Sequence, residues 1–157
     1  GGSSELKLFL QGQHGYEESL YAKRIRMLKS TLPIDLQFFN PDINKLISLS
    51  KGVILPFRVP FGYSQPPLTI LESMAMGRVV ISTNIGSIPE IIVDGLNGFL
   101  VPPSEPEKLS KVLLSLDEKN VSEIGKRALQ TIKDQYEWHI VCEKYIDAFK
   151  AIIGNSK

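Results

Sequence analysis

The feature that most constrains the fold is a regular alternation of short apolar runs with segments of helical spacing. Strands and helices that alternate along a chain form a parallel sheet, because each connection between parallel strands places a helix on a sheet face. Five runs have the length and the apolar or β-branched content of buried strands: residues 6–10, 34–39, 53–56, 79–83 and 99–101. The sequence therefore predicts an α/β fold with a Rossmann-like, three-layer parallel sheet flanked by helices.

Helices are predicted between these strands and beyond the last one. Between the strands they cover about residues 16–30, 42–49 and 67–76, with a short helical turn at 89–93. Three C-terminal helices are predicted at 105–116, 121–133 and 138–153. The first strand begins directly after Gly-Gly-Ser-Ser, so we interpret residues 1–4 as an expression scar and residues 5–157 as a domain excised from a longer protein.

The charge balance and the cysteine count argue against several classes of function. Lys and Arg number 18 and Asp and Glu 17, a net charge of +1, whereas nucleic-acid-binding domains carry a cationic excess. Cys142 is the single cysteine and His14 and His139 are the only histidines, so neither a disulfide nor a metal cluster is expected. No apolar run approaches the roughly 20 residues of a membrane span. We expect a cytoplasmic protein, and a peripheral place at the cytoplasmic face of the membrane stays open.

Glycine and proline are concentrated in one third of the chain. Residues 52–106 hold 6 of the 12 glycines and 8 of the 10 prolines, but only six charged residues. Loops at the carboxyl ends of parallel strands form the ligand crevice of open α/β sheets. A binding site is therefore expected in this third.

The segment from Pro66 to Gly77 has the strongest signal within that third. Prolines suit a first helical turn, where no backbone donor is needed, and glycine is typical of a helix end. The amides of Leu68 and Thr69, just after Pro67, would lie at the positive end of the helix dipole. Such a helix start is a general way to hold phosphate.

Glu72 follows one turn later, on the helical face shared by Leu68, Ala75 and Met76. A carboxylate buried on an apolar face needs hydrogen bonds to offset the cost of its burial. Two interpretations stay open: a helix-face glutamate that reaches solvent, or an acceptor for vicinal hydroxyls such as those of a ribose. The neighbouring glycine- and proline-rich loop favours the second.

A second loop, from Thr83 to Glu90, follows a predicted strand and opens a short helix. Gly86 permits a close backbone approach or a positive φ, Ser87 can cap the helix, and Glu90 suits its positive end. Each feature alone is ordinary turn chemistry. Together with the Pro66 to Gly77 segment they indicate one binding site.

Five linked motifs between Leu6 and Leu116 carry a resemblance to a known family. They are the strand ending at Pro56, Leu71-Glu72-Ser73-Met74-Ala75-Met76-Gly77, Val79 to Thr83, Gly86-Ser87-Ile88-Pro89-Glu90-Ile91-Ile92, and Asn97-Gly98-Phe99-Leu100-Val101-Pro102. In their order and spacing the sequence resembles the C-terminal, donor-binding domain of GT-B retaining glycosyltransferases of family 4, the glycosyl transferases group 1. The resemblance implies that a nucleotide sugar is bound as substrate, without cofactor or metal, beside an N-terminal acceptor-binding domain missing from this chain.

The resemblance also implies roles for single residues. Glu72 matches the second acid of the family's E-x7-E pattern, which binds the donor ribose. Ser64 stands at the position of the first acid, so that a neutral hydroxyl replaces the carboxylate expected near the reacting sugar. The family's diphosphate-binding arginine and lysine precede the strand that matches residues 6–10. Arg58 is the cation here that could approach a diphosphate.

Three other residues are interpreted from their positions. Arg78, between a predicted helix and strand, is assigned a structural role. His14 lies in the predicted turn after the first strand. Two interpretations are equally open: a residue that contacts the donor, or a surface residue of the turn without a role in binding. The turn at Asn40 is the expected place of base recognition.

The sequence thus favours the donor-binding domain of a hexosyltransferase that uses a saccharide or lipid-linked acceptor. The 157-residue chain is expected to be inactive alone. The alternative is a non-enzymatic ligand-binding or interaction module of the same fold, which Ser64 favours.

Overall fold

The computed structural model describes residues 6–9, 23, 27, 34–37, 42–59 and 67–154. The chain divides into two compact units, residues 1–43 and 44–157, and each is described by itself. In the first unit, β1 (Leu6–Phe9) pairs in parallel with β2 (Ile34–Gln37). The predicted helix over 16–30 lies outside the described residues, apart from Lys23 and Met27, which are helical.

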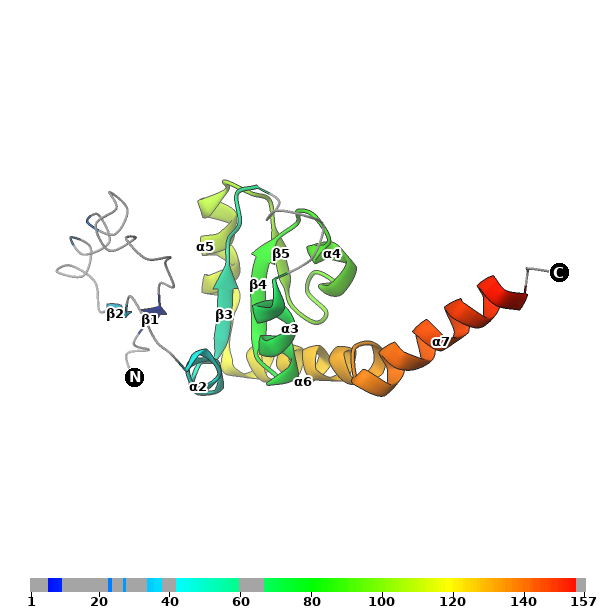
Figure 1. The fold of residues 1–157 in the computed structure, drawn as a ribbon. Coiled ribbons are helices and arrows are strands. Elements are labelled where there is room, and N and C mark those ends of the chain that lie inside the picture. Colours follow the sequence, from blue (N-terminus) through cyan, green and yellow to red (C-terminus); the bar gives the residue numbers. More distant parts are fainter. Residues whose placement is uncertain are drawn as a thin grey trace. The chain divides into compact units, whose positions relative to one another are not determined.

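The second unit contains a parallel sheet of three strands in the order β3-β4-β5 (Figure 1). The strands are β3 (Gly52–Leu55), β4 (Val79–Thr83) and β5 (Phe99–Val101). The central strand β4 is buried along its whole length, which is typical of a parallel strand covered on both faces. The predicted parallel α/β architecture is confirmed.

Within the described residues, six helices have defined bounds. They are α2 (Ile43–Leu49), α3 (Leu68–Ala75), α4 (Ile88–Ile91), α5 (Pro106–Ser115), α6 (Glu118–Gln135) and α7 (Trp138–Gly154). Only α6 begins clearly earlier than predicted, because the Asp117 carboxylate accepts a hydrogen bond from the Asn120 amide at 2.7 Å and caps the helix.

The core forms on both faces of β4, because successive side chains of a strand point to opposite sides. On one face Val80 packs with residues of α3, α4 and α6, among them Met74, Ile91 and Ala128. On the other face Val79 and Ile81 pack with Ile124 and with partly buried residues of α5. Helices therefore cover the sheet in a three-layer arrangement.

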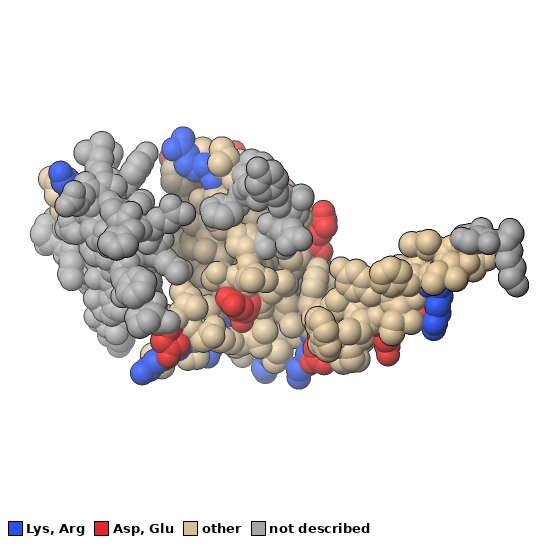
Figure 2. Space-filling view, in the orientation of Figure 1, with Lys and Arg blue, Asp and Glu red and all other residues tan. Residues whose placement is uncertain are grey.

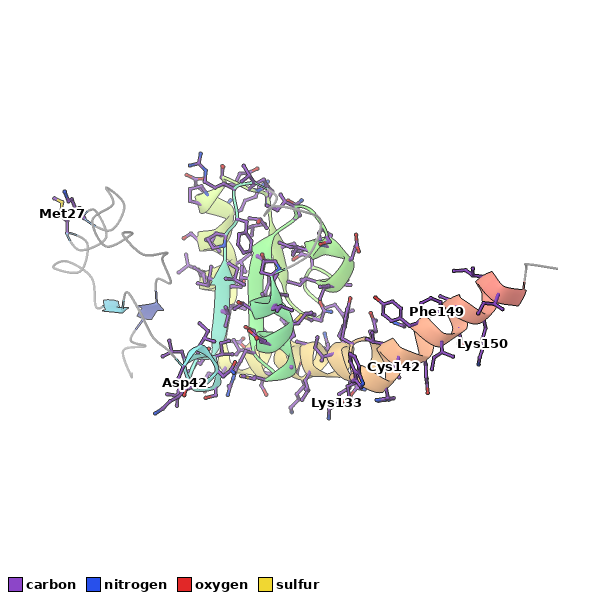
Figure 3. The ribbon with its side chains drawn as sticks, in the orientation of Figure 1. Met27, Asp42, Lys133, Cys142, Phe149 and Lys150 are labelled. Atoms are coloured by element: carbon purple, nitrogen blue, oxygen red, sulfur yellow. The ribbon has the colours of Figure 1, made fainter. Side chains whose placement is uncertain are left out.

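The last helix, α7, extends away from the end of α6 and has no buried residue (Figure 1). Phe149 and Lys150 point to opposite sides of it (Figure 3). Within the described ranges, no helix combines the length and the apolar character needed to cross a membrane.

Candidate functional site

Three loops begin at the edge of the sheet where β3, β4 and β5 end. The strands are parallel, so the segments after Leu55, Thr83 and Val101 all leave the sheet at the same edge. These segments lead into α3, α4 and α5, respectively. The starts of those helices therefore belong to the same edge, as the sequence predicts for a ligand crevice.

Both ends of α3 agree with the prediction. Pro67 directly precedes the helix with φ −56° and ψ 131°, and the Ile70 amide donates to its carbonyl oxygen at 2.9 Å. The amides of Leu68 and Thr69 come before that bond, in the first turn, where backbone donors have no partner within the helix. Gly77 ends the helix with φ +66°. The positive end of α3 thus lies at the carboxyl edge of the sheet.

The face of α3 that carries Glu72 is not the face that is buried. The buried residues of α3 are Ile70, Ser73 and Met74, because that side of the helix packs on α6 and β4. Leu68, on the side of Glu72, is 70% exposed. Glu72 itself is half-buried, and its carboxylate makes no hydrogen bond or ion pair with any described residue. Because the carboxylate is only half-buried, it does not need a partner within the protein to offset the cost of desolvation. It is therefore available as a hydrogen-bond acceptor for a ligand.

The loop after β4 is a tight turn held by backbone hydrogen bonds. The Asn84 amide donates to the Val101 carbonyl at 3.1 Å, and the Ile85 amide donates to Thr83 at 2.9 Å. Gly86 has φ +56°, which confirms the prediction of a positive φ. This turn joins the end of β4 to that of β5.

The helix start after this loop differs from the prediction in one respect. Ser87 occupies the N-cap position, but its side chain makes no capping hydrogen bond. Its φ of −87° and ψ of 3° are not the extended values that bring an N-cap hydroxyl over the first amides. Glu90 lies in the first turn of α4 as predicted.

The negative charge of Glu90 also acts on Tyr136. Burial raises the pKa of the Tyr136 phenol, and the negative charge of Glu90 raises it further.

Asn97, the first residue of one of the five motifs, has a structural role that the sequence did not predict. Its side chain is buried, accepts a hydrogen bond from the Val93 amide at 2.7 Å, and donates to Ile91 O and Thr131 Oγ1, both at 3.0 Å. It therefore joins the end of α4 and the turn before β5 to α6. The turn-forming pair Asn97-Gly98 directly before a predicted strand was the available signal.

The remaining predicted site residues are distributed as follows. Arg58 is exposed three residues after β3, at the same edge, and its role stays a prediction. Arg78 donates from Nη2 to the Ser48 carbonyl at 2.5 Å, which fits the structural role predicted for it. Ser64, Asn40 and His14 lie outside the described residues. Among the residues that are described, no group of three acidic, cysteine or histidine side chains could hold a metal ion.

Comparison with known proteins identifies the family. The family model for glycosyl transferases group 1 matches residues 3–119, so the chain belongs to this family. Sucrose synthase 5 of Arabidopsis thaliana is 32% identical over 114 residues, which cover 69% of this chain and 13% of that protein. The sucrose synthase of Thermosynechococcus vestitus is 28% identical over 153 residues, which cover 94% of this chain and 18% of that protein.

Solved structures show the same fold. HepE of Anabaena, crystallised with UDP-glucose, superposes with a TM-score of 0.71 at 20% identity, over 92% of this chain and 40% of that one. The C-terminal domain of a glycosyl transferase group 1 family protein (LpcC) from Francisella tularensis superposes with a TM-score of 0.61 at 26% identity, over 74% of this chain and 60% of that one. The fold is the C-terminal half of a GT-B glycosyltransferase, as predicted.

Proposed function

We propose that this chain is the part of a retaining hexosyltransferase that binds the nucleotide-sugar donor. The observation that carries the proposal is the carboxylate of Glu72, which no described residue pairs with, one turn into a helix whose positive end lies at the carboxyl edge of the sheet. Family membership and a relative crystallised with UDP-glucose support a uridine nucleotide as the donor. A cytoplasmic location is part of the proposal.

The chemistry follows from this arrangement. In the proposal, Glu72 accepts hydrogen bonds from the two ribose hydroxyls, and the first amides of α3 face the diphosphate. A diphosphate that gains negative charge as it leaves the sugar is stabilised by such fixed dipoles. Arg58, at the same edge, supplies a positive charge. The acceptor, a saccharide or lipid-linked hydroxyl, binds to a part of the protein outside this chain.

We expect Glu72→Ala to weaken the binding of UDP about 5- to 150-fold, which corresponds to the roughly 1–3 kcal/mol of lost hydrogen bonds to a charged group. Isothermal titration calorimetry measures the affinity. Glu143→Ala, which removes an exposed acid from α7, a helix that does not start at this edge, is the matched control and should bind UDP like the wild type. 2′-Deoxy-UDP should be less sensitive to Glu72→Ala than UDP. Equal losses for both nucleotides would contradict the ribose assignment.

Gly86→Val should lower the affinity for UDP more than it lowers stability. A β-branched residue at φ +56° is strained and shifts the loop between β4 and α4, which we place against the donor. Gly95→Val is the matched control, because Gly95 has φ +72° and lies in the turn before β5, at the other edge of the sheet. Calorimetry and urea denaturation on both variants test this. Normal UDP binding by Gly86→Val would show that the loop only connects β4 to α4 and does not contact the donor.

The second candidate is a non-enzymatic binding module of the same fold. Ser64, at the position of the first acid, favours it. UDP binding with no transfer by the full-length protein, across UDP-sugars and saccharide or lipid-linked acceptors, would support this alternative.

A further inference from the structure

A pocket lies at the amino edge of the three-stranded sheet, at the opposite ends of the strands from the candidate donor site. Its volume is ≈ 380 Å³, within the range of pockets that hold small molecules. Its polar lining comes from Lys51, Arg78, Glu118, Ser122 and Lys126, and Gly77 is part of its wall.

The fold explains why these residues meet. Gly52 pairs with Val79 in the sheet, so Lys51 and Arg78 precede neighbouring strand starts. Glu118, Ser122 and Lys126 are spaced by four residues on one side of α6. Helix α6 comes close to the strand starts because Gly125 packs against the carbonyl group of Gly77.

The pocket has an excess of positive charge. Lys51 Nζ pairs with Glu118 Oε1 at 2.8 Å, and this hydrogen bond and charge hold the pKa of the Glu118 carboxyl below its usual value. Lys126 makes no hydrogen bond or ion pair with any described residue. Among the described residues, the positive charges of Lys126 and Arg78 therefore have no compensating carboxylate. Figure 2 shows charged side chains along this lower edge, over α2 and α6.

Arg78 also has hydrogen-bonding capacity that the described residues leave unused. Of the five N–H donors of a guanidinium, one on Nη2 bonds to the Ser48 carbonyl, while the buried Nε has no partner. Buried polar atoms without a partner are rare and costly, so such an atom is a candidate for binding a ligand. The planar fork of a guanidinium matches the oxygens of a phosphate.

We propose that this pocket binds a phosphate group, carried by inorganic phosphate or by a small phosphate monoester, between Arg78 and Lys126. A small turn of the guanidinium gives Nε an acceptor oxygen, Lys126 supplies a second charge, and the Ser122 hydroxyl donates a further hydrogen bond. Glu118 stays paired with Lys51 at the rim. The proposal does not depend on the donor site, since no residue is shared.

NMR titration of the wild-type chain with inorganic phosphate, at constant ionic strength set with chloride, tests the proposal. We expect saturable shifts of the Arg78 Nε–Hε signal and of the Gly77 and Ser122 amides. Lys126→Gln should weaken binding about tenfold. Lys133→Gln is the matched control, because Lys133 is an exposed lysine of the same helix, seven residues further along, that does not line the pocket. It should leave the affinity unchanged.

Glycerol 2-phosphate is the second probe and separates the two sources of the phosphate group. Tighter binding than inorganic phosphate, again reduced by Lys126→Gln, would assign a phosphate monoester as the ligand, whereas equal or weaker binding would assign inorganic phosphate. Shifts that do not saturate, or that are the same in wild type, Lys126→Gln and Lys133→Gln, would overturn the proposal. An unshifted Arg78 Nε–Hε signal at saturating phosphate would overturn the role of Arg78.

Discussion

Replacing Gly125 with alanine should lower the free energy of unfolding by about 2–3 kcal/mol, the upper range for overpacking a well-packed site. A Cβ at Gly125 would overlap the carbonyl oxygen of Gly77 and lie 3.2 Å from its carbonyl carbon. Both are backbone atoms, and a backbone cannot move aside as a flexible side chain can. In the middle of an exposed helix, replacing glycine with alanine would raise the free energy of unfolding by up to about 1 kcal/mol. The contact with Gly77 therefore turns an ordinarily stabilising substitution into a destabilising one.

Urea denaturation of the purified chain measures this loss. Gly154→Ala is the control, because Gly154 is also helical but has no atom within 4 Å of an added Cβ. It should leave stability unchanged or slightly raised. A Gly125→Ala protein as stable as the wild type would show that α6 can retreat from the α3–β4 connection. The expected loss would instead establish that this contact holds α3, and with it Glu72, in place.

Asn97→Ala should lower the free energy of unfolding by roughly 2–4 kcal/mol. The side chain is 2% exposed and makes three hydrogen bonds, so its removal leaves the Val93 amide and the Ile91 carbonyl without partners. Each unsatisfied buried group costs about 1–3 kcal/mol. The loss should appear as a lower denaturation midpoint with an unchanged slope.

Asn120→Ala tests whether this cost belongs to the buried network. Asn120 is exposed in the first turn of α6, where its backbone amide, and not its side chain, bonds to Asp117. Its replacement should change stability by less than about 0.5 kcal/mol. Asn97→Asp adds a second comparison, because the carboxylate can still accept from the Val93 amide but cannot donate to the Ile91 carbonyl. If Asn97→Ala lost as little stability as Asn120→Ala, other groups would have to replace the hydrogen bonds of the Asn97 side chain.

The candidate donor site and the proposed phosphate pocket lie at opposite edges of one sheet and have different origins. At the carboxyl edge, every strand delivers a loop and the start of a helix, so a site there follows from the parallel topology. At the amino edge, the pocket exists because α6 crosses close to the strand starts at Gly77 and Gly125. Its charged residues are separated by up to 75 positions in sequence, from Lys51 to Lys126.

Local sequence was sufficient to predict most of the described elements, although not the start of α6. The alternation of strands and helices, the helix ending at Gly77, and the positive φ of Gly86 depend on periodicity and backbone sterics within a few residues. The resemblance to the family also depended on short linked motifs, and the match over residues 3–119 confirms it. These features could be predicted because their causes lie within each segment.

Tertiary structure alone decided which side of each segment is buried. Helix α3 has apolar residues around most of its circumference, so its periodicity did not show that Ile70 and Met74, rather than Leu68, face the core. The hydrogen bond from Asn97 to Thr131 and the meeting of Lys51, Arg78 and Lys126 are equally non-local. Burial and pairing at these positions are set by α6, which follows in the chain after the sheet and packs against residues distant in sequence.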